Sequence, residues 1–208
     1  MRGMDRPAEN GEGAEPPASM PLIAMAASAG GLQALTRVLT HLHGDFPAPV
    51  VVLQHLSRHH PSLLAEILQR IARLTVKPAS DGEQLNPGVI YCAIPDRHLL
   101  VLPGGRLSLS LDRATHFVRP SADRLFGSVA ESFGARTLAV ILTGTGVDGA
   151  DGVRAVYSKG GTVVVQSPET AEYAGMPRAA IATKCVSHVI ALDDIGPFIV
   201  DYAVNART

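Results

Sequence analysis

The period of the hydrophobic pattern changes repeatedly along the chain. Short continuous apolar runs, such as Leu22–Ala27 and Val50–Gln54, are each followed by a stretch in which apolar residues recur at helical spacing. Apolar runs that alternate with helices are typical of a parallel sheet covered on both faces, so the pattern predicts an α/β fold with a mostly parallel sheet. Further strands are predicted at 74–77, 138–142, 162–166 and 189–192, and helices at 32–42, 63–71, 121–133, 148–158, 177–182 and 195–204.

The middle of the chain interrupts this alternation. Residues 89–94, 98–102 and 107–111 form three short apolar or alternating runs, separated by Pro95-Asp96 and by Gly104-Gly105. Closely spaced runs with turn residues between them are typical of strands joined by tight turns. We therefore interpret this region as a β-hairpin or meander inserted into the α/β fold.

The first 20 residues differ in composition from the rest of the chain. They contain three glycines, three prolines and several charged residues, and their only large apolar side chains are methionines. Such a stretch buries too little apolar surface to offset the entropy lost on ordering. We expect a disordered tail over residues 1–20 and one domain over 21–208, a length that fits a single domain.

Composition and charge exclude several classes of function. The 208 residues carry a formal net charge of -1, which gives no general basic field for nucleic-acid binding. No apolar run approaches the roughly 20 residues of a membrane span, and the N-terminus lacks the pattern of a secretory signal. Two cysteines fit a reducing compartment. We therefore expect a cytoplasmic protein without membrane insertion.

Three polar residues follow three of the predicted strands. Ser28 follows the first strand, His55 the second, and Asp148 lies in the glycine-rich segment after 138–142. Ligands of open parallel sheets bind outside the carboxyl ends of the strands. A serine nucleophile needs an adjacent base, and a carboxylate can orient an imidazole base, so these residues predict nucleophilic acyl transfer. Backbone N–H groups at the next helix start and on the glycine-rich loop are candidates for an oxyanion site.

Each residue also has a structural interpretation that stays open. Ser28 and Asp148 are suitable N-caps, and a histidine at a strand end is often structural. An order of Ser28, Asp148 and His188 would match the α/β-hydrolases, but His188 begins the last strand and so lies at the wrong edge of the sheet. His55, His59 and His60 have no carboxylate or cysteine at a suitable spacing, and residues 27–31 match no nucleotide-binding turn. We expect no metal and no cofactor.

Five stretches together resemble the catalytic domain of the chemotaxis protein-glutamate methylesterases, the CheB type, over about residues 21–204. In order they are Ser28-Ala29-Gly30-Gly31, Gln54-His55, Arg119-Pro120-Ser121-Ala122-Asp123, Thr143-Gly144-Thr145-Gly146-Val147-Asp148-Gly149-Ala150 and Gly175-Met176-Pro177-Arg178. The resemblance implies a doubly wound sheet with an inserted β-hairpin and a triad of Ser28, His55 and Asp148. Family members hydrolyse γ-glutamyl methyl esters on chemoreceptor helices, releasing methanol, and many also deamidate glutamines there.

The sequence departs from the family pattern in a few places. Ala27 stands where the family usually has glycine, Thr145 and Val147 stand where it usually has Met and Asn, and Leu56-Ser57 follow His55 in place of Met-Pro. Only about 20 residues precede the first strand, so we expect the receiver domain of phosphorylation-regulated members to be absent from this chain. The departures affect the substrate groove more than the triad.

Taken together, we expect a cytoplasmic serine hydrolase that acts on methylated cytoplasmic helices of chemoreceptors. The N–H groups of Ala29, Gly30 and Thr145 are the oxyanion candidates. Arg119, from the resemblance alone, and Met176 are candidates for substrate contact. The alternatives stay open that Arg119 is a solvated surface charge and that Met176 simply begins a helix. A non-catalytic binding module of the same fold and a small-molecule esterase are the alternative functions. Nothing in the sequence indicates the oligomeric state.

Overall fold

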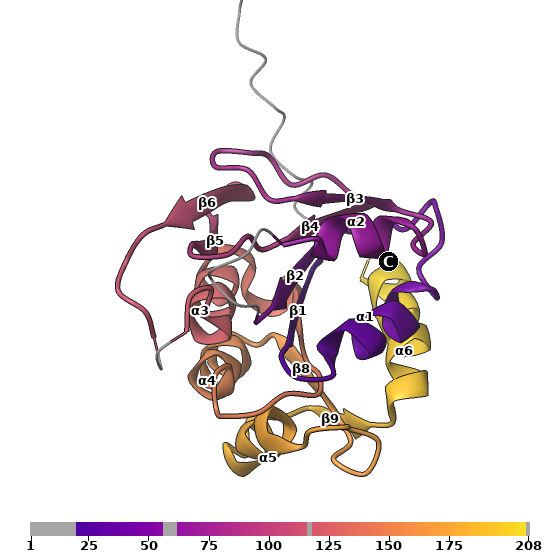
Figure 1. The fold of residues 1–208 in the computed structure, drawn as a ribbon, viewed down its shortest axis with the longest axis vertical. Helices are drawn as coiled ribbons and strands as arrows, with labels where there is room; N and C mark the ends of the chain where they lie inside the picture. The colour runs from indigo at the N-terminus through magenta and orange to yellow at the C-terminus, as the bar shows by residue number, and fades with distance from the viewer. Residues whose placement is uncertain (1–19, 56–61, 116–117, 207–208) are drawn as a thin grey trace, which may run out of the picture.

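A seven-stranded parallel sheet forms the centre of the described part of the chain, which in this computed structural model comprises residues 20–55, 62–115 and 118–206 (Figure 1). The strand order is β3-β4-β2-β1-β7-β8-β9. Its strands are β1 (Leu22–Ala27), β2 (Val50–Gln54), β3 (Thr75–Pro78), β4 (Val89–Cys92), β7 (Thr137–Ile141), β8 (Thr162–Gln166) and β9 (His188–Ile190). The helices are α1 (Gly31–Leu39), α2 (Leu64–Gln69), α3 (Ala122–Phe133), α4 (Ala150–Ser158), α5 (Gly175–Ala182) and α6 (Leu192–Asn205), with a 3₁₀ turn at Gly134–Arg136.

The sheet separates two hydrophobic cores. Successive side chains of a strand point to opposite faces. Accordingly, Ile23 and Met25 of β1 pack with α1, α2 and α6, whereas Ala24 and Ala26 pack with α3, α4 and α5. Figure 1 shows α3 and α4 on one side of the sheet and α1 and α6 on the other. The predicted doubly wound α/β fold is confirmed.

The middle of the chain corrects one prediction. Strand β4, which we assigned to an inserted meander, pairs parallel with β2 and β3 in the main sheet. Only β5 (His98–Leu102) and β6 (Arg106–Ser110) form a separate antiparallel hairpin. The physical reason is burial, because Ile90, Tyr91 and Cys92 are almost completely buried, as in a strand covered on both faces. The hairpin instead buries Leu99, Val101 and Leu107 against the core that contains α3.

The order in which the chain adds strands to the sheet reverses between β1 and β7. From β1 the chain adds β2 on one side, and it later returns to add β7, β8 and β9 on the other. Ligands in such sheets bind at this switch point, outside the carboxyl ends of the strands. The N–H of Ser28, after β1, donates to the carbonyl of Thr143, after β7, at 3.0 Å, so the two segments meet there.

The folded part begins slightly earlier than the sequence indicated. Met20, which we placed in the tail, is only 4% exposed, and its carbonyl accepts a hydrogen bond from Arg136 Nη1 at 3.0 Å. The rest of the expected tail, residues 1–19, and the candidates His59 and His60 lie outside the described residues. Within the described ranges, no helix combines the length and the apolar character needed to cross a membrane.

Candidate active site

Ser28 lies on a tight turn between β1 and α1. Its carbonyl accepts the N–H of Gly31 at 2.9 Å, and Gly30 has a left-handed φ of 73°. Gly31 cannot carry a side chain, because a Cβ there would lie 2.3 Å from Gln54 Oε1 and 2.7 Å from the Cβ of Ala27. The glycines therefore allow a sharp turn that leaves Ser28 partly exposed at the carboxyl edge of the sheet.

Two polar side chains from neighbouring strands hold this turn. Gln54, at the end of β2, donates from Nε2 to the carbonyl of Ser28 at 2.6 Å. Thr143, after β7, donates from Oγ1 to the carbonyl of Ala29 at 3.1 Å. The backbone carbonyls of Ser28 and Ala29 are thus both hydrogen-bonded to side chains of the adjacent strand ends. In the part of the chain that the structure describes, no hydrogen bond uses the N–H of Ala29 or Gly30.

His55 and Asp148 meet at the same edge. The backbone N–H of His55 donates to the carbonyl of Ala27 at 3.0 Å, which places the ring beside the Ser28 turn. Its Nε2 lies 2.9 Å from Asp148 Oδ2, and both side chains are largely buried. Among the described residues, no hydrogen bond joins Ser28 Oγ to His55. Catalytic hydrogen bonds are often longer in unliganded enzymes and tighten when the substrate binds.

The carboxylate of Asp148 occupies the N-terminus of α3. Its Oδ1 accepts from Ser121 Oγ at 2.7 Å, and its Oδ2 accepts from the N–H of Ala122 at 2.6 Å. Burial by itself would raise the pKa of Asp148, but the hydrogen bonds from His55, Ser121 and the Ala122 N–H outweigh burial and lower that pKa. Asp148 is therefore held ionised next to the imidazole, where it can orient the ring and stabilise its protonated form.

The glycine-rich segment after β7 packs directly against Ser28. At Gly144, a Cβ would lie 2.8 Å from the Cβ of Ser28 and 2.3 Å from Met176 Sδ. Met176 is only 1% exposed, and its N–H donates to the carbonyl of Gly144 at 2.9 Å. Met176 thus supports the segment from within the hydrophobic core. Thr145 is exposed, and within the described chain its N–H makes no hydrogen bond.

A cleft of about 550 Å³ opens over the Ser28 turn. Residues 28–33, Gln54, His55 and Glu172 line it. The candidate nucleophile and the candidate base therefore face one space, and the N–H groups of Ala29 and Gly30 border it. Such a site can bring an acyl carbonyl within reach of Ser28 while the imidazole receives the hydroxyl proton.

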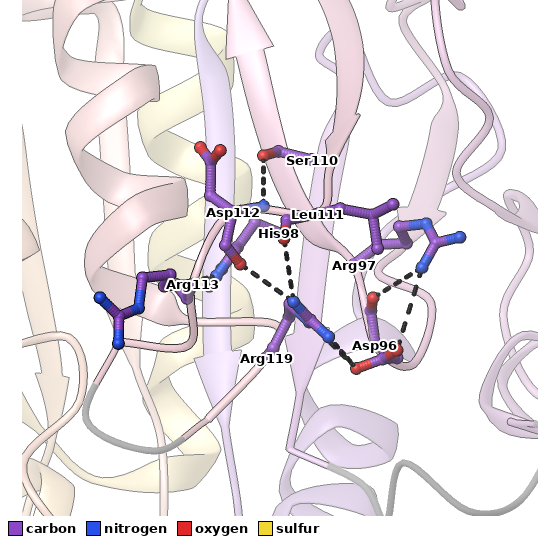
Figure 2. A network of polar contacts seen from close by, with 8 residues as sticks. All are labelled: Asp96, Arg97, His98, Ser110, Leu111, Asp112, Arg113 and Arg119. Carbon is purple, nitrogen blue, oxygen red and sulfur yellow. Dashed lines mark hydrogen bonds and ion pairs between the residues drawn. The ribbon is translucent and has the colours of Figure 1, made fainter.

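Arg119 is engaged by the protein itself (Figure 2). Its Nε and Nη2 donate to Asp96 Oδ1 at 3.0 and 2.6 Å, and its Nη1 donates to the carbonyls of Leu111 and Asp112 at 3.0 Å each. The guanidinium side chain is 21% exposed. It ties the segment after the hairpin to the loop before it, rather than standing as a solvated charge. Substrate contact by Arg119 stays a prediction.

The other candidates from the sequence have structural partners or lie elsewhere. Cys92 is buried in β4, and burial raises the pKa of its thiol to about 12, which leaves it inert at neutral pH. His41 Nδ1 lies 3.1 Å from the carbonyl of Arg37 at the end of α1. His188 begins β9, and β7 and β8 separate that strand from β1, which leads to Ser28. Within the described ranges, no group of three or more His, Cys, Asp or Glu side chains could hold a metal ion.

Sequence reasoning gave no role in the site to several residues that shape it, although all of them lie in the stretches that carry the family resemblance. Gln54 and Thr143 hold the serine turn, and Ser121 and Asp123 surround Asp148. Each acts on a residue more than 20 positions away, so local patterns carry little information about it. The available signals were their place in those stretches and their position at strand ends or helix starts on the same edge.

Comparison with known proteins places this geometry in a family. The model of the family described as CheB methylesterase matches residues 23–199. A protein-glutamate methylesterase/protein-glutamine glutaminase of Myxococcus xanthus is 41% identical over 84% of this chain, which spans 49% of that relative's length. A putative protein of the same description from Leptospira interrogans is 36% identical over 83% of this chain and 90% of its own. The chain thus spans about half the length of some relatives and most of others.

A solved structure extends the comparison to the backbone. The crystal structure of the Thermotoga maritima CheB methylesterase catalytic domain superposes with a TM-score of 0.84 and is 34% identical in sequence. The match covers 88% of this chain and 98% of that domain. The described fold therefore corresponds to a catalytic domain in nearly its full extent.

Proposed function

The chain belongs to the CheB methylesterase family, and from this premise we propose that it is a serine hydrolase for glutamate methyl esters of chemoreceptors. The observation that carries the proposal is the contact of His55 Nε2 with Asp148 Oδ2 at 2.9 Å, beside a cleft that Ser28 and His55 share. The names of the relatives also support protein-glutamine deamidation as a second activity.

In the acylation step, Ser28 Oγ attacks the ester carbonyl while its proton passes to His55. A neutral imidazole that donates from Nε2–H to Asp148 keeps the lone pair of Nδ1 for this proton. The Oγ–carbon bond forms, the bond from carbon to the methoxy oxygen breaks, and the proton moves from Nδ1 to that oxygen. Methanol leaves, and the glutamyl group remains as an ester of Ser28.

Deacylation repeats these transfers with water. The water oxygen bonds to the acyl carbon while His55 Nδ1 takes one of its protons, the bond from carbon to Ser28 Oγ breaks, and that proton passes to Oγ. The glutamic acid side chain is released and loses its remaining proton to solvent, which leaves a carboxylate. In both steps the carbonyl oxygen becomes negative, and the N–H groups of Ala29, Gly30 and Thr145 are our candidates for stabilising it. Asp148, held ionised by its hydrogen bonds, stabilises the imidazolium formed each time.

We propose that the partners are methylated cytoplasmic helices of chemoreceptors and that the protein is cytoplasmic. The protein-glutamate ester in the relatives' names requires a site that admits a side chain presented by another protein. A cleft open at the carboxyl edge of the sheet suits such a substrate, because the ester can enter while its helix stays outside. Two free cysteines, Cys92 and Cys185, agree with a reducing compartment.

The test is methanol release from methyl-labelled chemoreceptors by the wild type and by Ser28→Ala. We expect kcat to fall by on the order of 10⁴–10⁶ in the variant, since removal of a triad nucleophile leaves only binding and oxyanion stabilisation. Ser158→Ala is the matched control, because Ser158 ends α4 and, among the described residues, its hydroxyl bonds only the local carbonyl of Ala155.

Three outcomes would contradict the proposal. Near-normal turnover by Ser28→Ala would exclude this serine as the nucleophile. Receptor binding by the wild type without methanol release would favour a binding module of the same fold. Hydrolysis of short activated esters, with methylated receptors left intact, would favour a small-molecule esterase.

A further inference from the structure

Two aspartates bind the N-termini of each other's helices. Asp148 precedes α4, yet its carboxylate accepts the N–H groups of Ala122 at 2.6 Å and Asp123 at 3.3 Å, at the start of α3. Asp123 lies in the first turn of α3, yet its Oδ1 accepts the N–H groups of Gly149 at 3.0 Å and Gly152 at 2.8 Å, at the start of α4. We call this pair of contacts the reciprocal cap.

The Asp123 half of the reciprocal cap acts on the backbone next to Asp148. Gly149 follows Asp148 directly and has a φ of 102°, a conformation that disfavours side chains. By binding the N–H of Gly149, Asp123 fixes the peptide group between Asp148 and Gly149. Ser121 and Ala122 fix the carboxylate from the other side. The backbone and the carboxylate of Asp148 are therefore held by the first turn of α3.

Close packing of α3 on α4 keeps the reciprocal cap in register. At Gly152, a Cβ would lie 2.6 Å from the Cβ of Phe126 and 3.1 Å from the Cα of Asp123. The helices thus approach each other at a glycine, and neither can slide without breaking contacts of buried side chains. A displacement of Asp148 by even 1 Å would disturb its contact with His55.

From these contacts we infer that Asp123 is a positioning residue of the triad, which acts through Asp148 and does not itself touch the substrate. The inference rests on the proposed role of His55 and Asp148. Asp123 binds two N–H groups of α4, and those N–H groups belong to the turn that carries the carboxylate facing His55.

The charges around the pair favour a division of roles. Burial raises the pKa of Asp123. The hydrogen bond from the Gly152 N–H lowers this pKa, but the negative charges of Asp148 and Asp151 raise it further, and the net direction is upward. The pKa of Asp148 is instead lowered by its hydrogen bonds, from His55 at the end of β2 and from the start of α3. As pH falls, Asp123 therefore takes up a proton before Asp148 does, and Asp148 keeps its charge toward His55.

The experiment compares Asp123→Ala with Asp123→Asn in the full chain. For Asp123→Ala we expect kcat to fall by on the order of 10²-fold with little change in KM, because misplacing a catalytic group costs this much. The acid limb of kcat/KM should move to lower pH, since the imidazolium loses a fixed counter-charge. Asp123→Asn keeps a carbonyl oxygen for Gly149 and Gly152, so it should recover most of kcat.

Asp151→Ala is the matched control. Asp151 lies in the first turn of α4, the helix that Asp123 caps, and its exposed side chain pairs with Arg154, so its loss removes one negative charge nearby without breaking a hydrogen bond of the reciprocal cap. We expect wild-type kcat and an unmoved acid limb. If Asp123→Ala does not fold, Asp123→Ser takes its place in the experiment. A serine hydroxyl suits the start of a helix, but the shorter side chain does not reach the N–H groups of Gly149 and Gly152.

A second readout needs no turnover. The proton on His55 Nε2, observed in ¹H–¹⁵N spectra, should be slow to exchange in the wild type and in Asp123→Asn, and fast in Asp123→Ala. A wild type with this signal but without esterase activity would refute the proposed function and leave Asp123 supported. Asp123→Ala with a lowered Tm but an unchanged signal, kcat and acid limb would overturn the inference.

Discussion

Gln54 connects the end of one strand to the turn on the next. Its Nε2 donates to the carbonyl of Ser28, while its Oε1 is buried beside Gly31 and has no hydrogen-bond partner among the described residues. A buried amide oxygen that lacks a hydrogen bond lowers the stability of the fold. In return, the amide nitrogen of Gln54 fixes the position of the backbone carbonyl of Ser28, the candidate nucleophile.

We predict that Gln54→Met lowers kcat by on the order of 10²-fold, because the Ser28 turn loses its donor from β2 and the hydroxyl loses its alignment. Methanol release and urea denaturation measure the two effects. Gln69→Met is the control, since Gln69 also binds the backbone, at Leu74 and Val76, but lies on α2 away from the cleft. Equal kcat values for the two variants would refute a role of Gln54 in catalysis.

Asp148 makes folding stability depend on pH in a defined direction. Its pKa in the folded protein is lower than the value of about 3.9 for an unfolded aspartate. Its stabilising contacts are fully present above that value and are lost as pH falls from about 3.9 toward the folded pKa. Asp148→Asn should therefore destabilise the protein by about 1–3 kcal/mol at pH 7, and the difference from wild type should shrink below about pH 4.

Urea denaturation at a series of pH values measures this difference. Asp193→Asn is the control, because Asp193 is an exposed aspartate paired with Arg37 on the surface, where ion pairs contribute little. Its effect should be small at every pH. A constant difference between wild type and Asp148→Asn down to pH 3 would contradict the lowered pKa.

At the scale of elements, the contact of α3 with α4 fixes the geometry of the site. Both helices begin at the carboxyl edge of the sheet and bury their inner faces in one core. Their first turns carry the reciprocal cap, so the packing of two helices determines where one carboxylate points. Glycines decide how closely these helices approach.

Gly152→Ala should destabilise the protein by about 1–3 kcal/mol, because the new methyl group would meet Phe126 and the backbone of Asp123. Gly127 provides a matched control on α3, since a Cβ there meets nothing within 4 Å. Gly127→Ala should stabilise the protein by about 0.5–1 kcal/mol through helix propensity. Thermal unfolding measures both, and a neutral Gly152→Ala would show that the helices have room to separate.

At the scale of the whole molecule, the candidate site lies at the carboxyl edge of the sheet, and the first buried residue of the domain lies at the amino edge. Ser28, Thr143 and the glycine-rich segment meet at the switch point between β1 and β7. Met20 lies before β1, buried at the other end of the strand, where Arg136 binds its carbonyl.

Deletion of residues 1–19 should leave both kcat and Tm unchanged, because the composition of this segment offers little apolar surface to pack. Deletion of residues 1–20 also removes the buried Met20 and should cost about 1–3 kcal/mol. Thermal unfolding and methanol release measure the two truncations. A large loss of activity on removing 1–19 would show that this segment contributes to the domain.

The sequence by itself determined most of the sheet and the candidate triad. Continuous apolar runs such as Val50–Gln54 mark strands buried on both faces, and their carboxyl ends necessarily meet at one edge. Ser28, His55 and Asp148 could therefore be predicted as neighbours before any coordinates were known. The contact of His55 with Asp148 follows this prediction, whereas the catalytic roles of the three residues stay predictions.

The tertiary structure alone decided how the strands pair and how the triad is supported. The apolar run that forms β4 fits either a meander or the main sheet, and only pairing with β2, more than 35 residues earlier, selects the sheet. Asp123 and Gln54 lie in stretches that resemble the family, but their contacts have no local signal, because each binds a backbone group more than 20 positions away. Local periodicity reflects burial of a segment, but the partner that buries it is set by packing across the whole chain.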